Sequence, residues 1–209
     1  MTLPSETGGA TTEEVGYFEG ASRSLAEWLV VGLDGSWCVR PAGLSSMSEA
    51  VALLEGGNER DHYLWVPVGH WSVLLTSGLA GTDVGVLPSL AARKLGCRAM
   101  RVVVTSDETL YPARILEVFG PGGAPPLALE RSIVAANDGG RWVFETSGSP
   151  YAFEDLSVYK RRVKARRFTA EMVFSYQALL GVPVDQEVDW MNAWLVEPPA
   201  QSEQAPTLA

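Results

Sequence analysis

The stretch YLWVPVGHWSVLLT, residues 63–76, indicates the fold class. Two apolar, β-rich runs, 63–68 and 71–76, flank the dipeptide Gly69-His70, which is the pattern of a β-hairpin. Pro67 has no amide hydrogen to donate to a neighbouring strand, so the first strand is expected at an edge of its sheet. A hairpin is antiparallel, and we therefore expect an antiparallel sheet around it.

Downstream of this hairpin the chain alternates short apolar runs with turn residues. Asp138-Gly139 predicts a hairpin between the last two runs, and the Gly/Pro-rich residues 120–126 predict a loop. Pro88 and Gly96 bracket a short helix, because Pro suits the first helical turn and Gly the end. The predicted strands are 98–104, 113–119, 131–136 and 141–146.

Residues 25–40 are compatible with two structures. Ser24 and Glu27 have the spacing of a helix capping box. Asp34-Gly35 between the β-rich runs 28–31 and 37–39 instead predicts a hairpin. We favour the hairpin.

Two further helices are predicted. The first is short and covers 46–54, with Ser46 three residues before Glu49. The second is long and lies between residues 154 and 180, because Phe168, Met172, Tyr176 and Leu179 form one apolar stripe. Thr169 could also cap a separate helix within this range.

These elements predict an α+β protein with a mainly antiparallel sheet, a long C-terminal helix and two short helices. A hydrophobic content of 46% over 209 residues suits one globular domain, expected at 21–196. Residues 1–20 and 197–209 are polar and are expected to be flexible tails. The first 16 residues lack the pattern of a secretory signal, no apolar run is long enough for a membrane, and two cysteines make no disulfide framework. We therefore expect a cytoplasmic protein.

The formal net charge is −9, which disfavours nucleic acid and suits a basic partner. Six of the eight residues 160–167 are nevertheless Lys or Arg. A solvated helix face, paired with the acidic body, would explain this run. A docking surface for an acidic partner or a phosphate would explain it as well, and we favour the former.

The chemistry-bearing motifs of common enzymes are missing from the sequence. There is no His-Glu-x-x-His, no Cys-x-x-Cys and no nucleotide-binding glycine pattern, so neither a metal nor a cofactor is expected. The Gly-rich loop 78–85 contains Asp83 between a predicted strand and a predicted helix. Asp83 could cap the loop amides, or it could face a ligand together with Arg101, Arg114 and Glu145, because Arg side chains suit carboxylate or phosphate ligands. Trp190 and Trp194 have the spacing of one helical face and could dock on the domain or on a partner.

Two segments carry a resemblance to a known group of proteins. Residues 140–145, continuing through Gly148, Pro150 and residues 153–154 to Tyr159 and residues 167–168, resemble uncharacterised actinobacterial proteins. Residues 81–88 are similar to the same group, which implies no activity. In size, acidity and make-up the chain is also similar to immunity proteins of bacterial toxin systems.

From these observations we expect a non-enzymatic protein-binding module, in the manner of an immunity or antitoxin-like protein that neutralises a basic partner. The alternative is a small-molecule-binding protein or an enzyme without a motif, built on Asp83 and nearby arginines. A homo-oligomer that pairs through the expected edge strand 63–68 is a further alternative.

Overall fold

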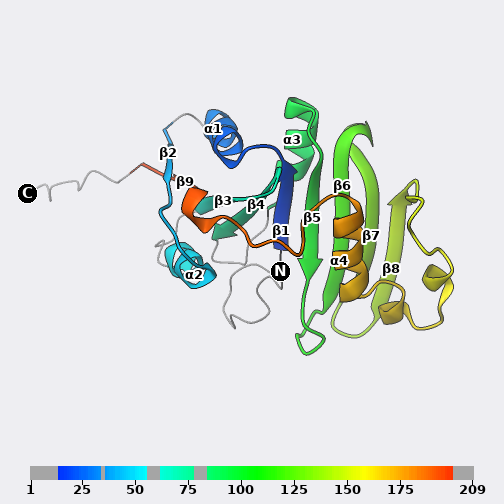
Figure 1. Cartoon of the computed structure of the whole chain (residues 1–209). Helices are drawn as coiled ribbons and strands as arrows, with labels where there is room; N and C mark the ends of the chain where they lie inside the picture. The colour runs from blue at the N-terminus through cyan, green and yellow to red at the C-terminus, as the bar shows by residue number, and fades with distance from the viewer. Residues whose placement is uncertain (1–13, 34–35, 56–61, 78–83, 200–209) are drawn as a thin grey trace, which may run out of the picture.

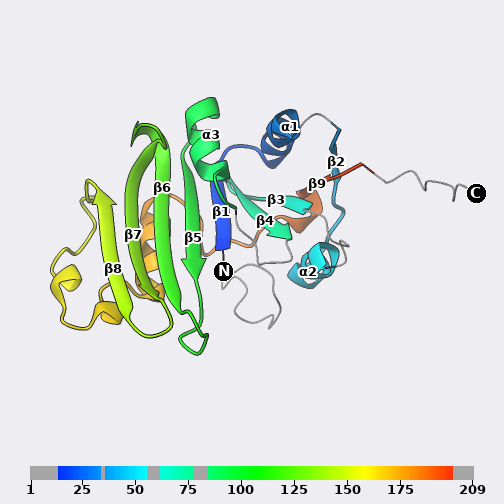
Figure 2. The ribbon, with the colours of Figure 1, turned by 180° about the vertical axis from the view of Figure 1, so that it is seen from behind.

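The computed structural model describes residues 14–33, 36–55, 62–77 and 84–199. Nine strands in these ranges form one sheet in the order β2-β9-β3-β4-β1-β5-β6-β7-β8, and each neighbouring pair is antiparallel. Helix α4 covers the β5–β7 part of the sheet, in front of it in Figure 1 and behind it in Figure 2, and α1 and α3 lie on the other side. The α+β class with a mainly antiparallel sheet is confirmed.

The hairpin of residues 63–76 is present as β3 (His62–Val68) and β4 (Trp71–Ser77). The prediction that β3 is an edge strand is wrong, because β9 (Trp194–Glu197) pairs with its free side. That pairing ends at Trp65, so no strand requires a hydrogen bond from the nitrogen of Pro67. The carbonyl of Pro67 accepts one from the amide of Asp189 at 2.8 Å.

The centre of the sheet is β1 (Glu14–Glu19), which lies between β4 and β5. These residues fall within the expected tail 1–20, and that part of the expectation is wrong. Tyr17 and Phe18 are buried on opposite faces, in separate apolar clusters. Packing explains the glycine at position 16, because a Cβ there would lie 2.6 Å from the Phe18 ring.

The favoured hairpin at 25–40 is also wrong, since Ser22–Gly32 is helix α1. Leu25, Ala26 and Leu29 are buried, and this spacing belongs to a helical face rather than to a strand. The predicted capping box does not form: the N-cap is Ala21, without a side-chain cap. Asp34-Gly35, the proposed turn, lies outside the described residues. After it, Cys38–Pro41 is strand β2, paired with β9.

The two short helices are confirmed. Helix α2 (Met47–Glu55) begins after Ser46, whose hydroxyl accepts a hydrogen bond from the Glu49 amide at 3.3 Å. Helix α3 (Leu87–Leu95) has Pro88 in its first turn and ends at Gly96 in the left-handed conformation. α2 packs on the same side of the sheet as α4, whereas α3 shares a cluster with α1.

The four predicted downstream strands are present and form a meander. They are β5 (Ala99–Val104), β6 (Ala113–Ala124), β7 (Leu129–Asn137) and β8 (Trp142–Gly148). The loop predicted at 120–126 is mostly strand, because β6 runs on to Ala124 through an irregular pairing with β7. Gly123 permits this close approach, since a Cβ there would overlap the Ala128 carbonyl.

The C-terminal helix is shorter than expected. Helix α4 covers only Ala170–Leu179, and the Thr169 hydroxyl accepts a hydrogen bond from the Met172 amide at its start. The alternative, a separate helix capped by Thr169, is therefore the correct one. Residues 154–168 form a loop with 3-10 turns at Val158–Lys160 and Lys164–Arg166.

The last segment of the fold returns to the far end of the sheet. A 3-10 turn at Trp190–Asn192 precedes β9. Glu197, assigned to the expected tail, belongs to β9 and binds Arg40 of β2 at 2.6 Å. The Arg40 contact lowers the pKa of the Glu197 carboxyl.

Candidate functional site

The strand register brings two of the predicted site residues to the same face of the sheet. Arg101 of β5 and Glu145 of β8 both point away from α4, on the side that carries α3. Arg114 of β6 pairs with Val104, three residues beyond Arg101, and so points to the opposite face. Asp83 lies outside the described residues. A single ligand therefore cannot meet Arg101 and Arg114 together.

Beyond the end of α3, no helix of the described part of the chain covers the face shared by β5 to β8 (Figure 2). We call this surface the open face. Its register forms two rows across the strands. The first row runs Glu14, Val103, Ile115, Val134 and Glu145, and the second runs Arg101, Glu117, Ser132 and Ser147.

Exposure on the open face rises toward β8. Val103 is buried, Ile115 and Val134 are half-buried, and Glu145 is exposed. The first row thus presents aliphatic side chains between carboxylates at both ends. Sheet faces of this kind, apolar in the middle and polar at the rim, are typical of protein interfaces.

Arg101 joins the two rows through ion pairs. Its Nη2 donates to Glu14 at 2.7 Å, and its Nη1 donates to Glu117 at 3.0 Å. The hydrogen bond to Glu14, aided by Glu117, raises the pKa of Arg101. The other carboxylate oxygen of Glu14 accepts the Val84 amide at 2.9 Å, so the chain directly after Asp83 is fixed to this site.

The charge of the open face is negative. Three carboxylates, those of Glu14, Glu117 and Glu145, face one guanidinium, that of Arg101. Because Arg101 is engaged by two carboxylates, it is poorly placed to bind an anionic ligand. Glu145 has no ion partner in the described part of the chain. The open face thus offers carboxylates to a basic group.

Arg114 has a different environment, between β6 and α4. Its side chain is 8% exposed and pairs with Asp107, whose side chain is 76% exposed. The guanidinium lies 4.9 Å from the centre of the Trp142 ring, a cation–π contact. These contacts bury Arg114 in the packing under α4.

The two tryptophans do not share a helical face. Trp190 lies in the 3-10 turn before β9, and Trp194 lies in β9 itself. Both rings are half-buried. Trp194 receives the Arg23 guanidinium at 5.0 Å from its ring centre, so it packs on α1. The docking of Trp194 on the domain is thereby observed.

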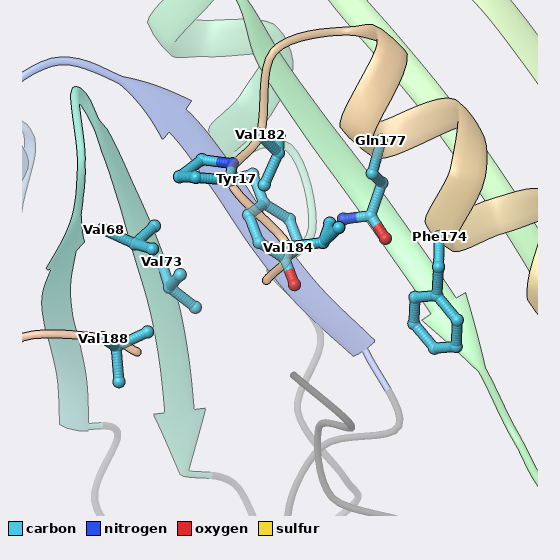
Figure 3. A pocket seen from close by; sticks show the side chains of 9 residues that line it. Tyr17, Val68, Val73, Phe174, Gln177, Val182, Val184 and Val188 are labelled. Carbon is cyan, nitrogen blue, oxygen red and sulfur yellow. The ribbon is translucent and has the colours of Figure 1, made fainter. Parts of the chain in front are cut away.

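A small cavity lies under α4 (Figure 3). Tyr17 and Gln177 line it together with aliphatic side chains of β3, β4 and the 182–188 segment. Its volume is about 10 Å³, which is room for about one water molecule. Burial raises the pKa of Tyr17 to about 12, and the nearby Gln177 amide acts in the opposite direction. The Gln177 side chain makes no hydrogen bond of ordinary geometry with a described residue. The cavity is too small for a substrate.

Sequence reasoning missed a buried ion pair between Arg131 of β7 and Glu154. Arg131 Nε and Nη2 donate to the two Glu154 oxygens at 2.9 and 2.6 Å, and Nη1 donates to the carbonyls of Ser147 and Gly148. Glu154 also accepts the Tyr151 amide and the Tyr159 hydroxyl. We call this cluster the Arg131–Glu154 clamp.

Several of the residues that carry the resemblance to actinobacterial proteins have a structural role in the clamp. Gly148, Glu154 and Tyr159 all belong to it. All three guanidinium nitrogens and both carboxylate oxygens are hydrogen-bonded within the protein, so the pair is poorly placed to bind a substrate. The clamp therefore holds the loop after β8 against the sheet.

The remaining reactive side chains do not gather. Cys38 is exposed, and Cys97 is half-buried. Burial raises the pKa of the Cys97 thiol, which disfavours a thiolate nucleophile. No three His, Cys, Asp or Glu side chains in the described ranges are placed to hold a metal ion.

No helix in the described part of the chain has the length and apolarity to cross a membrane. Comparisons with known proteins add no relative: no family model, curated protein or solved structure matches this chain.

Proposed function

We propose that the protein is a non-enzymatic protein-binding module that holds a basic partner on the open face. The observation that carries this proposal is the first row, in which half-buried Ile115 and Val134 lie in register beside exposed Glu145. Apolar side chains in the middle would supply burial on binding. The carboxylates around them would select a basic partner.

An immunity or antitoxin-like role is the biological form of this proposal. A basic toxin would be drawn to a protein of net charge −9, and such steering raises the association rate. The alternative of a small-molecule site at Asp83 and the arginines has weaker support. Arg101 is engaged by Glu14 and Glu117, and Arg114 lies on the other face.

The test compares two variants of equal charge change. Glu145→Lys places a cation on the open face, whereas Glu187→Lys replaces an exposed carboxylate in the 182–188 segment on the α4 side. Tagged wild-type protein and both variants are used to capture proteins from the native host, and captured proteins are identified by mass spectrometry. We expect one stoichiometric basic partner with wild type and Glu187→Lys, and at least about tenfold less with Glu145→Lys.

A partner is then purified and its affinity measured at increasing salt. Charge-steered binding should weaken as salt screens the carboxylates. Capture that is equal in both variants, or a complex that is insensitive to salt, would contradict the assignment of the open face. A toxin identity would be tested by whether wild type, but not Glu145→Lys, suppresses the growth inhibition caused by the partner.

A further inference from the structure

A second charged surface lies at the β8 end of the sheet. Residues 160–167, which we call the basic loop, contain six Lys and Arg side chains. Without them the formal net charge of −9 becomes −15. In Figure 1 the loop, coloured golden yellow, lies outside β8 at the end farthest from β2. The basic loop is thus separate from the α3 side of the sheet.

The basic loop differs from a solvated helix face paired with the acidic body. It has two 3-10 turns instead of a helix. None of its six cations makes an ion pair with a carboxylate in the ranges that the structure describes. Lys160, Arg162 and Arg166 are exposed. Four of the six cations are therefore exposed without an ion pair in the described ranges, and the other two, Lys164 and Arg167, are half-buried. Arg161 also acts on the carboxyl of Asp155, whose pKa it helps to lower.

The loop is also pre-shaped. Arg167 Nε donates to the Arg161 carbonyl at 2.6 Å, and Arg161 Nη1 donates to the Arg166 carbonyl at 3.3 Å. The Arg167 guanidinium lies 5.5 Å from the centre of the Phe144 ring on β8. The Arg131–Glu154 clamp holds the loop at its start through Tyr159. A surface ordered before binding loses little conformational entropy when a partner docks.

Exposed aliphatic side chains accompany the charges. Val163, inside the basic loop, is 51% exposed, and Leu156, just before it, is 45% exposed. The nearby aromatic rings are committed to the protein: Tyr159 packs on Phe144, and Tyr151 packs on Phe153. Exposed rings would be needed to stack nucleic-acid bases.

We propose that the basic loop binds a short acidic segment of another protein, in which apolar side chains lie between carboxylates. The six cations would meet the carboxylates, and Val163 would meet the apolar side chains. A short segment is favoured over a long polyanion, because nucleic acid or an anionic membrane would also meet the −15 remainder of the chain. The surface is distinct from the open face, which offers carboxylates instead.

The probe is a fluorescent peptide of alternating Glu and Leu, with a Glu/Ser peptide and a single-stranded DNA of equal charge for comparison. Binding to the full chain is followed by fluorescence anisotropy at low salt. The variant Lys160→Glu/Arg162→Glu/Arg166→Glu removes exposed cations that make no side-chain hydrogen bond with described residues. The matched control, Arg93→Glu/Lys94→Glu/Arg141→Glu, makes the same charge change at exposed positions elsewhere. Unchanged thermal melting shows that both variants fold.

We expect the loop variant to weaken binding of the Glu/Leu peptide by at least about tenfold, and the control by less than about threefold. Val163→Ser should weaken binding of the Glu/Leu peptide several-fold and leave binding of the Glu/Ser peptide unchanged. Equal losses in the two triple variants would show a general charge effect and overturn the proposal. So would DNA binding as tight as that of the Glu/Leu peptide, or no peptide binding to the wild type.

Discussion

Breaking the Arg131–Glu154 clamp should destabilise the protein more than any exposed ion pair. Both side chains are almost fully buried, at 3% and 0% exposure, and their closest atoms lie 2.6 Å apart. Glu154→Gln keeps the shape of the side chain but leaves the Arg131 charge without its carboxylate. Removing one partner of a buried pair costs about 3–5 kcal/mol. For a chain of this size that lowers Tm by about 10 °C.

The two halves of the clamp should respond differently. A guanidinium cannot lose its proton, whereas an unpaired carboxyl can become neutral. In Arg131→Met the Glu154 carboxylate keeps the hydrogen bonds from the Tyr151 amide and the Tyr159 hydroxyl. Arg131→Met should therefore be milder than Glu154→Gln.

Urea unfolding followed by tryptophan fluorescence measures both effects. The control is Arg40→Ala, which breaks an exposed pair with Glu197 and should cost at most about 1 kcal/mol. The double variant Arg131→Met/Glu154→Leu removes both charges and should recover much of the loss. If Glu154→Gln cost no more than Arg40→Ala, the clamp would not hold the loop and the reasoning would fail.

Three smaller predictions concern Gly148, the cap of α4 and Tyr17 in the central strand. Gly148→Ala should lower the free energy of unfolding by several kcal/mol, because φ is +77° and a Cβ would overlap the Glu130 carbonyl. The control is Gly140→Ala, whose added Cβ would have no neighbour within 4 Å. Urea unfolding compares the two variants, and equal losses would contradict the steric argument. Thr169→Ala should lower the free energy of unfolding by about 1 kcal/mol by removing the cap of α4, with Thr169→Ser as the control that retains it. Burial raises the pKa of Tyr17 from 10.0 to about 12, so its contribution to stability is present below pH 10 and is lost as the pH rises toward 12. Tyr17→Phe should therefore lose less stability than the wild type between pH 10 and 12. Identical curves of unfolding free energy against pH for the two proteins would refute this.

The parts of the fold that could be predicted are those with strong local signals. The β3–β4 hairpin and the meander β5–β8 combine period-two apolar runs with turn residues, and α3 has Pro88 and Gly96 at its ends. These signals do not depend on distant contacts, so local sequence is sufficient. The α+β class follows from them.

The errors occurred where tertiary packing decides the structure. α1 contains Trp28 and four valine or leucine residues that occur in strands and helices alike, and its burial against β3 and β4 selects the helix. β1 has polar ends and a central glycine, so its alternation is weak, yet it pairs on both sides. One long helix was predicted from the apolar stripe between Phe168 and Leu179, but only the part after Thr169 is helical, and the basic loop before it forms 3-10 turns.

The candidate site was predictable only in part, because the face on which a strand residue lies depends on the register. Arg101 and Arg114 both stand directly before apolar residues, and nothing in the sequence separates them. The pairs Arg101–Glu117 and Val104–Arg114 place them on opposite faces. The same register brings Glu14, Ile115 and Glu145 into one row although they are far apart in the chain. A binding surface made of single residues from five strands has no local motif, and the lack of a catalytic signature in the sequence is what such a surface would leave.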